Sequence, residues 1–249
     1  MNKRLGLSAA LATVCAALAV PASALGSAEP PAAVTAAAAK PTVRVMPLGD
    51  SITVGVGSPT RSSYRRPLWN LVAGQSRYTV RFVGSQAGGE LPDTHHEGHS
   101  GYLIDGIRAE VDQWIAAERP DVVLLHIGVN DLNRGTDPGH AGDRLKALLD
   151  RIFADRPGVT VIMQGVIPTT QGLKSSPTAF NDQARGLQAP EAKAGHTFRF
   201  VDPPALTANE MSDRLHPNDA GYQRMADAFF APLDQAVTTG RIAAGVPVG

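Results

Sequence analysis

The sequence predicts an α/β protein with a five-stranded parallel β-sheet and helices on both of its faces. Short apolar segments rich in β-branched residues alternate along the chain with segments whose apolar residues recur at helical spacing. Glycine or proline marks several of the junctions between them. Such an alternation favours parallel strands joined by crossover helices, which cover both faces of one sheet.

Five segments have the composition of strands. They are short, apolar and enriched in Val, Ile, Leu or Phe, which suits strands buried between two helix layers. We expect these strands at residues 43–48, 78–84, 121–127, 159–166 and 198–201. A glycine-rich segment, residues 85–100, is expected to be a loop.

Helical periodicity fills most of the intervals between the strands. The clearest helix is the last one, because Tyr222, Met225, Phe229 and Leu233 form one apolar stripe and Pro217 suits a first helical turn. The helices are expected at residues 64–75, 103–115, 145–153, 177–194 and 217–233. Pro120 and Pro157 follow the second and third of them and suit helix ends.

The N-terminal residues have the pattern of a secretory signal peptide. Lys3 and Arg4 precede an apolar, alanine-rich run, and small residues around Ala22 suit cleavage after Ala24. A membrane anchor is the alternative, but the run is short against the roughly 20 apolar residues that a spanning helix needs. We therefore expect residues 1–24 to be removed and the protein to be secreted.

The remaining chain is expected to form one domain. Residues 25–40 are rich in Ala and Pro without a helical period, which is typical of a disordered spacer. The domain is expected at residues 41–239, followed by a C-terminal tail at residues 240–249.

Charge and cysteine content narrow the functional classes. The chain has 23 basic and 23 acidic residues and no basic run, so a nucleic-acid surface is not expected. The only cysteine, Cys15, lies in the expected signal peptide, so the mature chain would have no disulfide. No later segment has the length and apolarity of a membrane span, and we expect no stable membrane insertion.

A candidate nucleophile follows the first expected strand. In open parallel sheets, ligands bind beyond the carboxyl ends of the strands. Ser51 stands there, in the tripeptide Gly49-Asp50-Ser51. A serine needs a base and an oxyanion stabiliser before it can attack an ester. An ordinary turn is the alternative for this tripeptide, which also lacks the G-x-S-x-G pattern of another hydrolase class.

Groups that would complete such a site follow other strands. His216 lies in the loop after the fifth strand, and Asp213 is placed to orient its ring, as in a serine triad. Asn130, shortly after Gly128, can donate a side-chain N–H to an oxyanion, and Gly101 can offer a backbone N–H. The alternatives are helix caps, loop turns and a surface histidine.

Three histidines and a glutamate in residues 95–99 raise the question of a metal site. His96-Glu97-Gly98-His99 is one residue short of the H-E-x-x-H pattern, and its context is a glycine-rich loop instead of a helix. We therefore expect neither a metal nor another cofactor.

Taken together, these segments resemble the four sequence blocks of the SGNH/GDSL hydrolases, in order. The matching residues are Gly49-Asp50-Ser51, Gly101, Gly128-x-Asn130-Asp131 and Asp213-x-x-His216-Pro217. The resemblance implies a three-layer α/β/α, flavodoxin-like fold. It also implies a triad of Ser51, His216 and Asp213, with an oxyanion hole formed by Asn130 and the backbone N–H groups of Ser51 and Gly101. Asp50 and Gly128 would support these groups.

A narrower resemblance links four segments to carbohydrate esterase family 3, a branch that contains acetyl xylan esterases. They are residues 46–53, 82–85, 97–101 and 216–222. This resemblance implies a secreted serine esterase that removes short acyl groups, such as acetyl groups on xylan, from a small-molecule or polysaccharide ester. A general lipase or arylesterase with the same triad is the first alternative, and a non-catalytic glycan-binding domain is the second.

Overall fold

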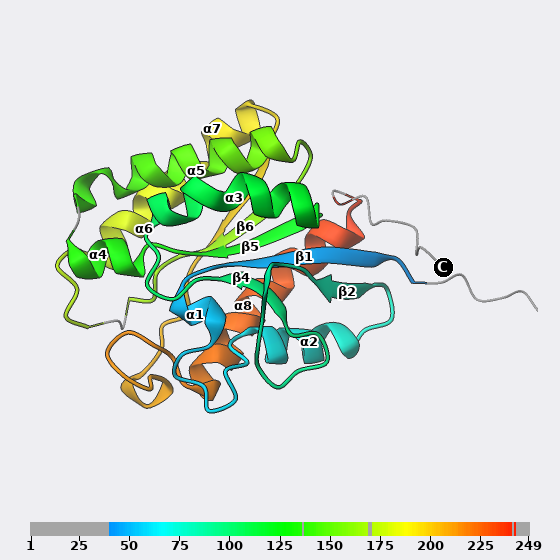
Figure 1. Ribbon diagram of the computed structural model, residues 1–249, viewed down its shortest axis with the longest axis horizontal. Helices are drawn as coiled ribbons and strands as arrows, with labels where there is room; N and C mark the ends of the chain where they lie inside the picture. The colour runs from blue at the N-terminus through cyan, green and yellow to red at the C-terminus, as the bar shows by residue number, and fades with distance from the viewer. Residues whose placement is uncertain (1–39, 136, 169–170, 241, 243–249) are drawn as a thin grey trace, which may run out of the picture. The chain divides into compact units, whose positions relative to one another are not determined.

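A computed structural model describes residues 40–135, 137–168, 171–240 and 242, and Figure 1 shows them as a ribbon. The signal peptide expected at residues 1–24 lies outside the described residues. Almost all of the expected spacer and most of the expected tail also lie outside them.

The sheet is built around β1 (Thr42–Gly49), whose second half is buried at every position. On one edge β1 pairs in parallel with β5 (Val122–His126), and β6 (Thr160–Gln164) and β7 (Thr197–Val201) continue in parallel beyond it. Because β5 and β6 are buried at every position, both of their faces carry apolar side chains. This explains why residues 122–125 of β5 and 161–163 of β6 are apolar without alternation.

The other edge of β1 is shared by two strands. β2 (Thr79–Phe82) pairs in parallel with the first half of β1, and β4 (His95–Gly98) pairs in parallel with its end. The five expected strands thus stand in the order β2-β1-β5-β6-β7, which is the flavodoxin-like order. The predicted fold class is confirmed.

The expectation that residues 85–100 form only a loop is wrong. They contain β4 and the short β3 (Gln86–Ala87), which pairs antiparallel with β4. Glycine and charged residues are depleted in strands, so local composition gave no strand signal. The pairing depends on tertiary contacts instead, since a Cβ on Gly84 would lie 2.3 Å from the backbone carbon of His96.

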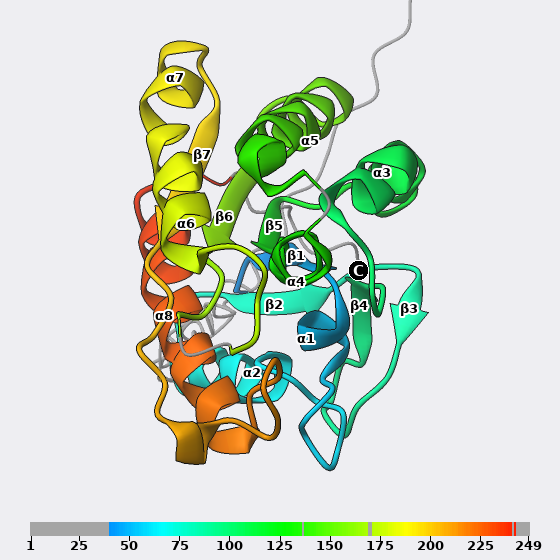
Figure 2. The same ribbon diagram turned by 90° about the vertical axis from the view of Figure 1, so that its left-hand side faces the viewer.

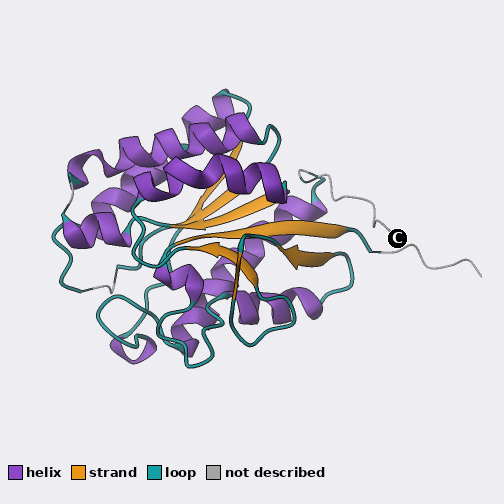
Figure 3. Ribbon diagram, viewed as in Figure 1, coloured by secondary structure: helices purple, strands orange, loops and turns teal. Residues whose placement is uncertain are grey.

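Helices cover both faces of the sheet, as Figure 3 shows by colour. One face carries α3 (Ile104–Glu118) and α5 (Ala141–Asp155), which pack against each other. Beside α5 lie α6 (Pro177–Gly186) and α7 (Gln188–Lys193), which divide the single helix expected at residues 177–194.

The opposite face carries α2 (Arg65–Ala73) and α8 (Asp219–Thr238), which also pack against each other (Figure 2). The cap of α8 is Asn218, whose side chain accepts the N–H groups of Ala220 and Gly221 at 3.0 and 3.3 Å. Pro217 therefore precedes the helix and does not stand in its first turn, because the asparagine side chain supplies the acceptor that starts the helix.

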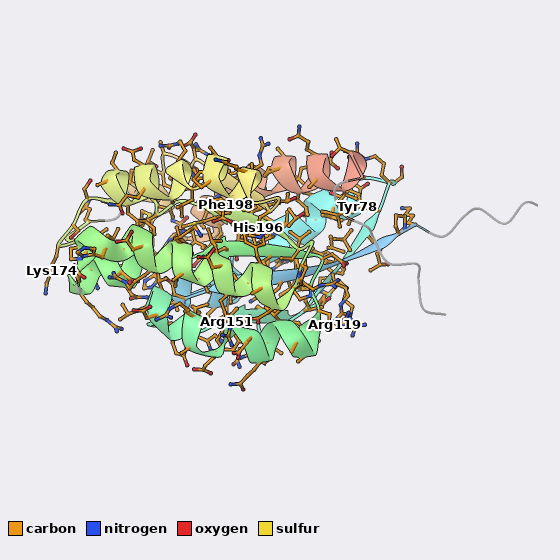
Figure 4. The ribbon with its side chains drawn as sticks, turned by 90° about the horizontal axis from the view of Figure 1, so that it is seen from above. Tyr78, Arg119, Arg151, Lys174, His196 and Phe198 are labelled. Carbon is orange, nitrogen blue, oxygen red and sulfur yellow. The ribbon has the colours of Figure 1, made fainter. Side chains whose placement is uncertain are left out.

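Short helices mark the carboxyl edge of the sheet. α1 (Ser51–Val54) follows β1 directly, and α4 (Val129–Arg134) follows β5. Two 3₁₀ turns, η1 (Pro138–His140) and η2 (Ala208–Glu210), lie in the longer loops. In Figure 4, Lys174 marks one end of the unit, while Tyr78 and Arg119 lie toward the other. Lys174 donates to the carbonyl of Arg134, the last residue of α4, at 3.0 Å. The end of the unit marked by Lys174 is therefore the one at which the carboxyl ends of the strands lie.

Among the described helices, none combines the length and the apolar character needed to cross a bilayer.

Candidate active site

Ser51 lies at the point where β1 turns into α1. The side chain of Asp50 caps α1 by accepting the N–H of Ile52 at 3.0 Å. A Cβ on Gly49 would lie 2.1 Å from the carbonyl oxygen of His126, so only glycine allows β1 to approach β5 this closely at the turn. The turn brings Ser51 to the first position of the helix, at the carboxyl edge of the sheet.

His216 and Asp213 form a chain of hydrogen bonds with Ser51. The hydroxyl oxygen of Ser51 lies 2.9 Å from Nε2 of His216, and Nδ1 of the same ring lies 2.8 Å from Oδ2 of Asp213. A carboxylate only accepts hydrogen bonds, so it assigns the ring proton to Nδ1 and leaves Nε2 as an acceptor for the serine hydroxyl.

The carboxylate of Asp213 is held by its own loop. Oδ1 accepts the backbone N–H groups of Leu215 at 2.7 Å and His216 at 2.8 Å. Partial burial raises the pKa of the Asp213 carboxyl, but the hydrogen bonds from the His216 ring and from these backbone groups outweigh it, so its pKa is lowered. Asp213 is therefore an anion wherever the histidine ring is needed as a base.

Close packing between two loops holds the serine and the histidine at this distance. Gly57 has φ +96°, and a Cβ there would lie 2.2 Å from the carbonyl oxygen of Pro217 and 3.1 Å from Cβ of His216. The hydroxyl of Tyr222 donates to the carbonyl of Val56 at 2.5 Å. Sequence reasoning missed Gly57, because nothing near it in the chain indicates its contact with the distant histidine loop.

Asn130 lies near the same edge of the sheet, in α4. Its side-chain nitrogen donates to the carbonyl of Tyr102 at 3.0 Å and lies 3.4 Å from Oδ2 of Asp50. Gly128 caps α4 at φ +114°, and a Cβ there would lie 2.7 Å from the ring of Phe180. A side chain at Gly128 would therefore displace either Phe180 or the helix that carries Asn130.

Gly101 lies in the turn between β4 and α3, with φ +81°. Its carbonyl accepts the guanidinium of Arg134 at 2.8 Å, and the next residue, Tyr102, donates its N–H to the carbonyl of His99 at 3.1 Å. Among the described residues, no group accepts the N–H of Gly101. The structure thus joins the Gly101 turn to Asn130 through Tyr102, and Asn130 to the serine turn through Asp50.

Asp50 is fully buried beneath this arrangement. Burial raises the pKa of its carboxyl to about 7, the hydrogen bond from Ile52 opposes the rise, and the nearby negative charge of Asp131 adds to it. Asp131 is itself buried, accepts the N–H of Ile104 at 3.1 Å and forms an ion pair with Arg144 at 3.1 Å. Its contacts anchor the start of α3 and do not reach Ser51.

The histidines of residues 95–99 take separate partners. His95 pairs with Asp93, while Nδ1 of His96 accepts the N–H of Gly98 at 3.0 Å. His99 bonds to the fully buried Glu97 at 2.6 Å and stacks between two aromatic rings, those of Tyr102 and Trp114. Within the described residues, no three His, Cys, Asp or Glu side chains are grouped as a metal site would need.

The sequence analysis also did not identify a buried arginine that holds two segments near the site together. Arg65 is fully buried and donates to the carbonyls of Thr94 at 2.9 Å, Arg61 at 3.1 Å and Val54 at 3.4 Å. Burial lowers the pKa of its guanidinium to about 10. Arg65 ties the end of α1 to the segment before β4, and the sequence offered no signal to separate it from the exposed Arg66.

The arrangement has the parts of an acyl-transfer site. A serine hydroxyl faces a ring nitrogen that can accept its proton, and a carboxylate orients the ring. Asn130 and Gly101 lie in two neighbouring segments that are joined to the serine turn through Tyr102 and Asp50. The site residues expected from the sequence thus come together at the carboxyl edge of the sheet.

Comparison with protein families gives a match to the GDSL-like lipase/acylhydrolase family over residues 48–224. The chain is also similar to a multidomain esterase of Ruminococcus flavefaciens, with 25% identity over 233 residues. That alignment covers 82% of this chain but 30% of the esterase, so the chain spans under a third of its relative.

Solved structures with the same fold include two carbohydrate esterases. A family 3 carbohydrate esterase of Clostridium thermocellum shares 33% identity at a TM-score of 0.71, and the match covers 82% of this chain and all of that one. A family 3 carbohydrate esterase of Talaromyces cellulolyticus shares 28% identity at a TM-score of 0.68, covering 79% of this chain and 99% of that one.

Proposed function

The chain belongs to the GDSL-like lipase/acylhydrolase family and is a carboxylic ester hydrolase, and from that premise we propose that it removes acetyl groups from polysaccharide such as xylan. The observation that carries the chemical part of this proposal is the chain of hydrogen bonds from Ser51 through His216 to Asp213. The similarity to family 3 carbohydrate esterases supports the substrate part.

In the proposed mechanism, the hydroxyl oxygen of Ser51 attacks the acyl carbon while Nε2 of His216 takes its proton. The negative oxygen that forms is bound by the side chain of Asn130 and by the backbone N–H groups of Ser51 and Gly101. His216 then gives the proton to the leaving alcohol, and an acyl-enzyme remains on Ser51.

The second half of the reaction repeats the first with water. His216 takes a proton from the water as its oxygen attacks the acyl-enzyme, and returns that proton to Ser51 as the ester bond to the enzyme breaks. Asp213 stays ionised throughout and stabilises the protonated ring. Asp50 acts indirectly, by capping α1 and by its contact with Asn130.

The substrate part is tested with two series of esters. We expect acetate release from acetylated xylan, and a higher kcat/KM for p-nitrophenyl acetate than for the octanoate, because a pocket fitted to acetyl rejects longer chains. A lipase-like pocket would instead gain roughly 0.8 kcal/mol for each buried methylene. A kcat/KM that climbs from acetate to octanoate, with no acetate released from xylan, would replace this proposal with a general esterase or lipase. The Ser51→Ala variant is the control for uncatalysed hydrolysis.

We also propose that the protein is exported. The support is the sequence pattern of residues 1–24, with basic residues, an apolar run and small residues before the expected cleavage point. The measurement is intact mass of the protein recovered outside a bacterial host that expresses the full chain. Loss of residues 1–24 supports export, and an uncleaved chain retained in the cell contradicts it.

A further inference from the structure

A pocket of about 480 Å³ opens beside the proposed oxyanion turn. Its walls include Val54 at the end of α1, Gly88 after β3, and Ser100 and Tyr102 on either side of Gly101. In both Figure 1 and Figure 2, α1 lies next to β4. The pocket is therefore joined to the site of Ser51 by the two segments that carry the nucleophile and a proposed oxyanion donor.

The ring of His96 faces this pocket from β4. The residue is 4% exposed, and Nδ1 accepts the backbone N–H of Gly98 at 3.0 Å. A nitrogen that accepts a hydrogen bond carries no proton, so in the neutral ring the proton is on Nε2. Among the described residues, no group accepts a hydrogen bond from Nε2. His96 thus presents to the pocket an N–H donor that the described residues leave without a partner.

This donor persists over a wide pH range. Burial, and after it the positive charge of Arg65, lower the pKa of His96 to about 3. The ring is therefore neutral above about pH 4. A neutral donor suits an uncharged oxygen acceptor, such as a hydroxyl, ether or ester oxygen.

The space in front of Nε2 is open. A Cβ built on Gly88 would lie 3.8 Å from Nε2 of His96 and within 4 Å of no other atom. The side chain of Gln86, which pairs with His96 in the register of β3 and β4, lines the same pocket. Arg61 also lines the pocket.

We propose that this pocket is a subsite for the alcohol portion of the ester, and that Nε2–H of His96 donates a hydrogen bond to an oxygen of the sugar that carries the acyl group. The proposal rests on the proposed function and adds to it a specificity-determining residue. The p-nitrophenyl group of p-nitrophenyl acetate has no hydroxyl or ring oxygen to place there, so hydrolysis of that ester should not depend on His96.

Two substitutions of His96 distinguish the loss of its N–H donor from a disturbance of the fold. In His96→Asn, the amide oxygen can take the place of Nδ1 and accept the Gly98 N–H, while nothing reaches into the pocket. In His96→Gln, the longer side chain brings an N–H group back toward the position of Nε2. The substrates share one acyl group: a methyl xyloside monoacetate and p-nitrophenyl acetate.

We expect His96→Asn to lower kcat/KM for the xyloside acetate about tenfold, which is the effect of one lost hydrogen bond, with most of the change in KM. Its kcat/KM for p-nitrophenyl acetate should stay within about twofold of wild type, and His96→Gln should recover part of the loss. Equal losses on both substrates, or no loss on either, would overturn the proposal.

Gly88→Leu tests the pocket without changing His96. The new side chain would project toward Nε2 and should reduce activity on the xyloside acetate selectively. Gly186→Leu is the matched control, because Gly186 lies on α6 and a Cβ there meets no atom within 4 Å. If Gly88→Leu changes the preference for acyl length and leaves the alcohol preference unchanged, the pocket holds the acyl group and the proposal is wrong.

Failure of the proposed function itself would be visible in the wild-type protein. In that case wild type cleaves p-nitrophenyl acetate but releases no acetate from any sugar acetate. Both the proposed substrate and the proposed subsite would then be wrong. Failure of the subsite alone leaves wild-type activity on the xyloside acetate intact, with no selective effect of His96→Asn or Gly88→Leu.

Discussion

The hydroxyl of Ser51 and Nε2 of His216 lie 2.9 Å apart, although 165 positions separate the two residues in the chain. The distance is set by the sheet, because β1 and β7 are parallel and the segments that follow them leave from the same edge. The close contact of Gly57 with the His216 loop then fixes the final approach. We therefore expect substitution of either Ser51 or His216 to lower kcat.

Ser51→Ala is expected to lower kcat at least about 10³-fold, because it removes the nucleophile and leaves only binding and oxyanion stabilisation. A serine-directed phosphonate should label wild type at Ser51, as located by mass spectrometry. Ser63→Ala is a matched control, since the hydroxyl of Ser63 is buried and has no hydrogen-bond partner among the described residues. Full activity in a folded Ser51→Ala variant would refute the assignment.

Substitutions of His216 and Asp213 are expected to lower kcat to different extents. His216→Ala removes the base and should lower kcat at least about 10³-fold, whereas Asp213→Asn should lower kcat by a smaller factor. The asparagine oxygen can still accept the N–H groups of Leu215 and His216, so the loop keeps its shape while the ring loses its orienting charge. The comparison requires kcat for both variants at the same pH. A larger loss from Asp213→Asn would mean that the carboxylate has another role.

The sequence was sufficient for the parts of the fold that have a periodic signal. All five expected strands are present. β5 and β6 are buried at every position and largely apolar, whereas β2 and β7 alternate buried residues with more exposed ones. It was insufficient for β4, because residues His95 to Gly98 have no strand composition. The packing around β4 depends on Gly84 and Gly98, which closely approach the backbone of His96 and of Val54.

The candidate site shows the same division. The blocks with Ser51, Asn130 and His216 have recognisable spacing, and their positions after strands predict that they meet at one edge. Gly57, Arg65 and the donor on His96 have no local signal, because their significance lies in contacts with residues far away in the chain.

Asn130→Ala is expected to lower kcat about 10²- to 10³-fold with a small change in KM, because its N–H would strengthen its bond only as the oxyanion forms. Asn133→Ala is the control from the same helix, since Asn133 bonds to Arg214 and does not contact Asp50 or Tyr102. Steady-state kinetics on p-nitrophenyl acetate provide both constants. A change confined to KM would indicate a role in substrate binding.

Chelation is expected to leave activity unchanged. His95, His96 and His99 each have a different partner, so their rings do not converge on one point. The measurement is the rate of ester hydrolysis before and after dialysis against EDTA. Activity that disappears with EDTA and returns with a divalent cation would show that a metal is required and would contradict the expectation.

Asp50 gives a prediction about stability and pH. Burial raises the pKa of Asp50 to about 7 in the folded protein, above the ordinary value of 3.8. The folded state therefore holds a proton on this carboxyl between those values, where the unfolded state has lost it. The sign follows from linkage: the contribution of Asp50 is fully present below about pH 4 and is lost as the pH rises through about 7.

Asp50→Asn keeps the oxygen that accepts the Ile52 N–H but cannot ionise. The free energy of unfolding of this variant minus that of wild type should therefore increase from pH 4.5 to 7.5, by at most about 3 kcal/mol at about 1.4 kcal/mol per pKa unit. Urea unfolding of both proteins at several pH values measures this difference, and Asp227→Asn, exposed on α8, is the matched control. Only the difference is informative, because other carboxylates change the stability of both proteins. A difference that stays constant over this range would mean that Asp50 is already ionised in the folded protein at pH 4.5, and that its hydrogen bonds outweigh its burial.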